Sequence, residues 1–153
     1  MKIRKTMMQA VVAAAGLSVA GCATPVFMQG SGGKSGQAMT QPMKSSEASP
    51  AGQGTVAVAK GPSGNTSLTV RVKHLAPAER LANDTSVYVV WVEPEGAAPQ
   101  NVGVLSVDDN LQGSLTTITP HKRFKVMVTP EKSGELTAPE HDEVFTTDVQ
   151  RND

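Results

Sequence analysis

The sequence predicts an all-β fold, a two-sheet immunoglobulin-like β-sandwich of about seven strands that follows a disordered tether. Three observations predict it. Short runs rich in valine and threonine alternate between apolar and polar side chains across residues 55–153. Proline, glycine, aspartate and asparagine interrupt these runs at short intervals, as turn residues do. Helical patterns are scarce, since only residues 77–81 (PAERL) suit a helical turn.

Alternation identifies most of the strands, because successive side chains of a strand point to opposite faces of a sheet. Residues 55–59, 68–73 and 123–128 alternate in this way. Residues 86–92 (SVYVVWV) are apolar on both faces, which predicts a central strand. The other predicted strands are residues 102–107, 114–118 and 143–149. A set of about seven short strands is typical of a sandwich.

The first 21 residues have the composition of a secretory signal peptide. Basic residues lie at positions 2, 4 and 5, an apolar run covers residues 7–20, and Gly21 precedes Cys22. A membrane span needs roughly 20 predominantly apolar residues. This run is shorter and rich in alanine, so we expect a cleaved signal and not a permanent span.

Residues 19–22 (VAGC), with Leu17 just before them, resemble the lipobox of bacterial lipoproteins. Those proteins are cut before the cysteine, which carries fatty acids such as palmitate. The resemblance implies that Cys22 is lipidated and that the chain is anchored in the cell envelope. An aspartate directly after the lipidated cysteine resembles an inner-membrane retention signal in enteric bacteria. This chain has Ala23 at that position, so the outer membrane is the expected location.

Residues 22–54 are predicted to form a flexible tether. They consist largely of Gly, Ser, Gln, Pro, Lys and Met and show no apolar period of a strand or a helix. A coil of this length has a root-mean-square reach on the order of 30 Å. The whole chain has 14 basic and 14 acidic residues, and loss of the three basic signal residues makes the mature charge about −3, which argues against nucleic acid as a partner.

Three segments, residues 87–96, 101–105 and 124–131, together with Pro139, resemble the extracytoplasmic C-terminal domain of the anti-sigma-K factor family. That family has a similar Tyr-x-x-Trp strand, a glycine-containing hairpin and a Val-Thr-x-Glu-type turn. The resemblance covers residues 68–149 and implies an immunoglobulin-like sandwich. Family members add a transmembrane helix and a cytoplasmic sigma-binding segment, whose place is taken here by the lipobox and the tether. We therefore do not expect this chain to bind a sigma factor directly. We expect a module that binds or senses a partner in the cell envelope.

The histidines are the candidate metal ligands. His74, His121 and His141 each lie at a predicted strand end or turn, without a ligand spacing such as His-x-x-x-His. A metal site would require all three to meet at one end of the sandwich. Methionines at positions 28, 39 and 43 could bind cuprous ion through their thioethers. A periplasmic copper- or zinc-binding protein is thus the alternative function.

Tyr88 and Trp91 are the candidate partner surface, because amphipathic aromatic side chains favour places where one end stays wet. The competing interpretation places Trp91 in the core of a central strand. The sequence contains no recognisable nucleophile elbow, metal motif or phosphate loop, so neither an enzyme nor a cofactor is predicted. The expected function is a non-enzymatic binding or structural module, with the membrane and an envelope protein or ligand as partners.

Overall fold

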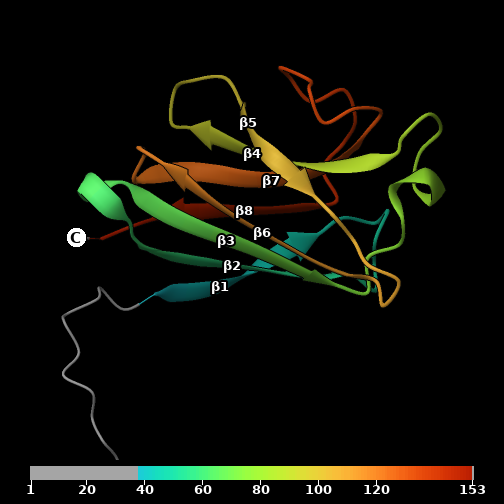
Figure 1. The fold of residues 1–153 in the computed structure, drawn as a ribbon, viewed down its shortest axis with the longest axis horizontal. Helices are drawn as coiled ribbons and strands as arrows, with labels where there is room; N and C mark the ends of the chain where they lie inside the picture. The colour runs from blue at the N-terminus through green and yellow to red at the C-terminus, as the bar shows by residue number, and fades with distance from the viewer. Residues whose placement is uncertain (1–37, 153) are drawn as a thin grey trace, which may run out of the picture. The chain divides into compact units, whose positions relative to one another are not determined.

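The computed structural model describes residues 38–152, which form eight β-strands and two short 3-10 turns (Figure 1). The elements in chain order are β1 (Met39–Ser45), β2 (Gln53–Lys60), η1 (Pro62–Gly64), β3 (Thr66–Lys73), η2 (Ala78–Arg80), β4 (Val87–Pro94), β5 (Gln100–Leu105), β6 (Gln112–Thr119), β7 (Arg123–Glu131) and β8 (Phe145–Gln150). The predicted signal peptide, Cys22 and the first part of the predicted tether lie outside the described residues. Within residues 38–152, no helix has the length and apolar character needed to cross a membrane.

All eight strands belong to one antiparallel sheet with the order β5-β4-β7-β8-β1-β2-β3-β6. Strand β1 joins its two halves, because Met39–Met43 pair with β2 and Lys44–Ser45 pair with β8. The two edge strands, β5 and β6, approach each other beside a bridge between Val107 and Gly113, so that the sheet is nearly closed. The all-β prediction is confirmed, whereas a two-sheet, seven-stranded immunoglobulin-like sandwich is not.

Strand β1 corrects the predicted tether of residues 22–54, because the folded part begins no later than Met39 and not at residue 55. Strand β1 escapes prediction because Met43 is its only buried apolar side chain. Backbone pairing with two neighbours forms the strand, and the Gln41 side chain donates hydrogen bonds to Thr147 Oγ1 at 2.9 Å and to the Asp148 carbonyl at 2.6 Å. Pairing of this kind leaves no apolar period in the sequence.

Gly52 and Gly54 allow close packing, although the glycine-rich composition of this segment predicted a tether. A Cβ atom added to Gly54 would lie 3.0 Å from the Phe145 ring and 3.1 Å from Cβ of Met43. Gly52 lies even closer to the same ring, which a Cβ would approach to 2.7 Å. Phe145 can therefore bury itself against the start of β2 only because these positions lack side chains.

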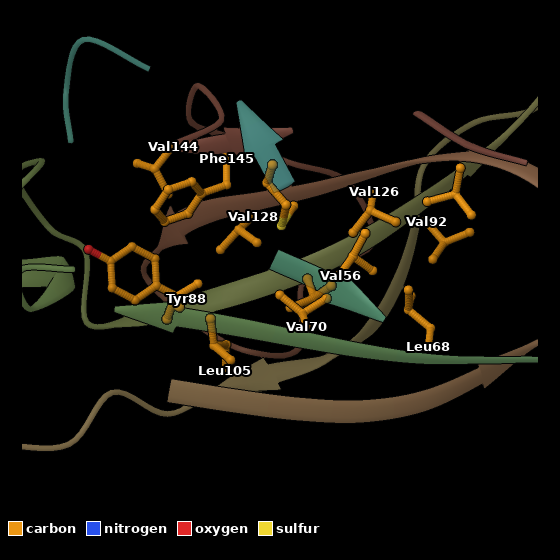
Figure 2. Close-up of a cluster of buried hydrophobic side chains, with 14 of the residues drawn as sticks. Val56, Leu68, Val70, Tyr88, Val92, Leu105, Val126, Val128, Val144 and Phe145 are labelled. Atoms are coloured by element: carbon orange, nitrogen blue, oxygen red, sulfur yellow. The ribbon is translucent and has the colours of Figure 1, made fainter. Parts of the chain in front are cut away.

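The core is filled by the inward-facing side chains of both halves of the sheet (Figure 2). Val56 and Val70 face it from one half, and Val126, Val128 and Phe145 face it from the other. Each of these five residues is 0% exposed, and burial of this extent stabilises by about 1.5–3 kcal/mol for a valine- to phenylalanine-sized group.

Strand β4 is apolar on both faces, as predicted for residues 86–92. Tyr88, Val90 and Val92 enter the main core, while Val89 and Trp91 belong to a second cluster on the outer face. The Tyr88 hydroxyl leaves the core and donates a hydrogen bond to the Ala76 carbonyl at 2.5 Å. Burial, with a smaller contribution from the Glu79 carboxylate, raises the pKa of this hydroxyl.

Candidate functional site

The outer face of β4, β7 and β8 carries the features that suit recognition. Its cross-strand rows divide it into a charged end, a middle part with an apolar cluster, and an end with a buried carboxylate. Lys125 of β7 stands between Glu93 of β4 and Asp148 of β8 in the charged row. Trp91 and Met127 are cross-strand partners in the middle, and Val87 lies opposite Glu131 at the far end.

The charged end forms an open groove of about 520 Å³. Its walls are formed by the end of β4 with the turn after it, the start of β7 and the end of β8. The charged side chains that line it are Glu93, Glu95, Arg123, Lys125 and Asp148. Arg123 Nε lies 3.5 Å from Glu95 Oε2, and Lys125 Nζ lies 3.7 Å from Glu93 Oε2. Exposed pairs of this kind contribute about 0–1 kcal/mol to stability, so their charges remain available to a partner at little cost to the fold.

The middle of the face is covered by residues 132–143, which we call the covering loop. Leu136 of this loop packs on the outer apolar cluster of Val89, Trp91 and Met127. Trp91 is 0% exposed as a result. The apolar outer row of β4 is thus a second, smaller core, closed by a loop that has no regular secondary structure.

A buried carboxylate holds the far end of the covering loop. The Glu131 side chain is 0% exposed, and its Oε1 accepts hydrogen bonds from Thr129 Oγ1 at 2.7 Å, from the Glu140 amide at 3.1 Å and from the His141 amide at 3.4 Å. Its Oε2 lies 3.0 Å from His141 Nδ1. A buried charge is tolerated only when such partners replace water. Glu131 therefore organises the return of the loop toward β8.

The same network reaches the indole of Trp91. Trp91 Nε1 donates a hydrogen bond to Thr129 Oγ1 at 2.8 Å, and this hydroxyl in turn donates to Glu131. The Thr129 hydroxyl thus gives a hydrogen-bond partner both to the buried indole N–H and to the buried carboxylate beneath the covering loop. In chemical terms the carboxylate is committed to hydrogen bonds within the fold, and its surroundings suit a structural role better than proton transfer to a substrate.

Two further contacts hold the covering loop on its other sides. Asn101 Nδ2 donates hydrogen bonds to the carbonyls of Gly134 and Leu136, each at 2.9 Å. Lys132 Nζ lies 2.8 Å from Glu140 Oε2 and so closes the base of the loop. The hydrogen bond and charge of Glu140 raise the pKa of the exposed Lys132 ammonium. These contacts come from β5 and from the loop itself, which makes the loop part of the folded unit.

The predicted partner surface of Tyr88 and Trp91 does not exist as an exposed platform. Tyr88 is 2% exposed and faces the main core, while Trp91 lies under the covering loop. The two side chains leave opposite faces of β4, because their positions in the strand differ by an odd number of residues. The core interpretation of Trp91 is the one that the structure supports.

The histidines do not converge on one site. His74 follows β3 and is exposed, while His121 lies in the turn between β6 and β7, at the opposite end of the sheet. His141 is in the covering loop and pairs with Glu131, so a solvated turn describes it poorly. Among residues 38–152, no group of three potential His, Cys, Asp or Glu ligands could hold a metal ion.

Of the remaining candidate residues, some lie outside the described residues 38–152 and some lie within them. Cys22, the predicted lipidation site, and Met28 lie outside this range. Met39 and Met43 both belong to β1, but Met39 is 41% exposed while Met43 is buried in the core at 7%. A shared thioether site of these two side chains is thus not formed within β1.

Sequence reasoning missed the two main features of this face. Thr129 and Glu131 belong to the Val-Thr-x-Glu pattern of the sequence, but the pattern did not show that Glu131 is buried, because its backbone donors come from nine and ten residues further on. The groove has no signal either, since its charges lie on three strands. Neither protein-family models, nor curated proteins, nor solved structures match this chain.

Proposed function

We propose that this chain is a lipid-anchored lipoprotein of the bacterial envelope whose β-domain binds an envelope partner without catalysing a reaction. The groove at the charged end of β4, β7 and β8 carries this proposal. It is open, and its charges alternate in sign across the strands in the order Glu93, Lys125 and Asp148. A surface of this kind fits an extended polar peptide that bears both signs of charge, because each charged side chain of the groove can then lie opposite a peptide side chain of the opposite charge.

The anchoring part of the proposal rests on the lipobox at residues 19–22 and on Ala23. Acylation of Cys22 would hold the domain at the membrane, in the outer membrane of the envelope. Intact mass spectrometry of the native protein and of a Cys22→Ser variant tests it, together with separation of inner and outer membranes. An acyl mass on the native chain alone, found in the outer-membrane fraction, is the expected result. An unmodified cysteine in a membrane-free native protein would contradict it.

The binding part is tested by site-specific photo-crosslinking in intact cells. A photoreactive residue at Gln150, which lines the groove, is compared with one at Thr55, which is exposed on β2 outside it. We expect a defined protein adduct from position 150 only, and we expect Lys125→Glu to abolish it while Lys60→Glu does not. Equal adducts from both positions, or adducts indifferent to Lys125→Glu, would exclude the groove as the binding surface.

The resemblance to the anti-sigma-K extracytoplasmic domain belongs to the same proposal. The residues that carry it have structural roles here: Tyr88 and Trp91 fill two cores, and Glu131 holds the covering loop. Gly103 adopts φ 142°, and a Cβ there would meet the Leu115 side chain at 3.2 Å. Residues with such roles are those that related immunoglobulin-like domains would share. An experimental structure of a family member with the same covering loop over its tryptophan would support the relationship, and a different strand order would contradict it.

A further inference from the structure

Strand β6 is an edge strand. Strand β5 approaches its free side at Gly113 and Leu115, and no strand of the described residues pairs with that side over residues 116–119. On one side all eight of its residues pair with β3, from Gln112 opposite Lys73 to Thr119 opposite Thr66. On the other side, within the described part of the chain, the only bridge joins Gly113 to Val107. The N–H and C=O groups of residues 115–119 that point to this side are therefore unpaired along the edge of the sheet.

The other edge strand, β5, is protected where β6 is not. Strand β5 contains a register irregularity opposite Val90 and Trp91, and a bulge of this kind disrupts further pairing. The covering loop also contacts β5, through Asn101 and through the close approach of Gly134 to Val104. Strand β6 (QGSLTTIT) has no charge, no proline and no register shift, which are the usual protections of an exposed edge.

The surface beside this edge is apolar at one position. Ile118 points outward and is 51% exposed, more than the other exposed large apolar side chains of the described residues, which are Met39, Val104 and Leu111. Its neighbour on the same face, Thr116, is also exposed. A strand added to the edge would cover Ile118 and pair the backbone at the same time.

We propose that the occupant of this edge is β6 of a second copy of this chain, in antiparallel orientation about a two-fold axis. An antiparallel pair of identical strands is self-complementary, as a two-fold interface requires. Charge favours this orientation. The exposed Asp108 and Asp109 precede β6, and the exposed Lys122 follows it. Antiparallel pairing brings the acidic end of one copy toward the basic end of the other, whereas parallel pairing would bring like charges together.

The register follows from the alternation of side chains. Outward residues must face outward residues of the partner for the two sheets to continue each other, so the pairing must relate positions of the same parity. Centring the two-fold axis on Thr117 satisfies this condition and keeps the pairing within residues 115–119. Thr117 of one copy then lies opposite Thr117 of the second copy, and Thr116 lies opposite Ile118 of the second copy on the outer surface. The contact is short, so the dimer is weak and depends on protein concentration.

Sedimentation velocity of the full-length protein in detergent, over a range of concentrations, tests the association. We expect a monomer–dimer equilibrium in the native chain and a dissociation constant at least about tenfold higher for Ile118→Lys, because a lysine would interrupt the new sheet. Met39→Lys is the matched control, since Met39 is 41% exposed on β1 and away from the edge. A native protein that stays monomeric at about 1 mM, or equal weakening by both variants, overturns the inference.

Disulfide formation tests the register separately. Opposed cysteines at non-hydrogen-bonded positions of antiparallel strands have Cα atoms about 4.5 Å apart, which permits a disulfide. Thr117→Cys should form a crosslinked dimer under mild oxidation, and Thr55→Cys on the outer surface of β2 should not. Crosslinking of both variants, or of neither, contradicts the two-fold pairing on β6. The inference does not rest on the groove, because neither variant touches a groove residue.

Discussion

The Thr129 hydroxyl links two buried polar groups, and its removal gives a quantitative test of the network beneath the covering loop. It accepts from Trp91 Nε1 at 2.8 Å and donates to Glu131 Oε1 at 2.7 Å. Valine has nearly the same shape without the hydroxyl. In Thr129→Val the indole N–H, 0% exposed, loses its acceptor, which costs about 1–3 kcal/mol. Glu131 Oε1 keeps two backbone donors, so the loss there adds about 1 kcal/mol.

The expected destabilisation of Thr129→Val is therefore about 2–4 kcal/mol. Urea unfolding followed by far-ultraviolet circular dichroism measures it, in a Cys22→Ser background that avoids detergent. With a slope of about 1–3 kcal/mol per molar urea, the midpoint should fall by roughly 0.7–4 M.

Thr116→Val is the matched control for this experiment. Thr116 is exposed, and its hydroxyl lies 3.0 Å from that of Thr69. Water can replace this contact, so the change should stay within about 0.5 kcal/mol. If Thr129→Val unfolded at the same midpoint as Thr116→Val, the network would not stabilise the fold, and the reasoning about buried hydrogen bonds here would be wrong.

Three further predictions concern the covering loop, the start of β2 and the ionisation of Tyr88. Asn101→Ala should remove two hydrogen bonds to the loop and cost about 1–2 kcal/mol; faster amide exchange confined to residues 132–143 is the expected readout, and unchanged exchange would contradict it. Gly54→Ala should destabilise by about 1–3 kcal/mol because its Cβ meets Phe145. Gly61→Ala should cost less in the same urea assay, because its Cβ would stay 3.3 Å from the nearest atoms. Tyr88 is the only tyrosine of the chain, and its raised pKa means that folding stability is intact below about pH 10 and falls as pH rises further. Tyrosinate absorbance should thus appear only with unfolding in native buffer but near pH 10 in urea, and native titration near pH 10 would refute the burial argument.

The strands of this protein could largely be predicted from its sequence. Each predicted strand has a counterpart among β2 to β8, because a strand with one buried face needs alternating side chains, and the alternation is visible locally. The apolar residues on both faces of 86–92 correctly predicted a strand buried on two sides. Residues 77–81 contain the 3-10 turn η2, as their composition indicated.

Strand β1 and the candidate site could not be predicted in this way, because their determinants are contacts between distant segments. Gln41 reaches β8 across more than a hundred residues, and the backbone pairs of β1 require no particular side chains. Trp91, Thr129 and Glu131 come together only when β4 and β7 pair in one register and the covering loop returns over them.

By itself, then, the sequence determined the all-β class and most of the strands, and its residues 19–22 resemble a lipobox and so predict an anchor at Cys22, since each of these depends on neighbouring residues. Only the tertiary structure decided that the strands form one nearly closed sheet, that Tyr88 and Trp91 are buried, and that Glu93, Lys125 and Asp148 line up across a groove. The physical reason is that strand order and register set which distant side chains meet, and the alternation within a strand carries no information about its neighbours.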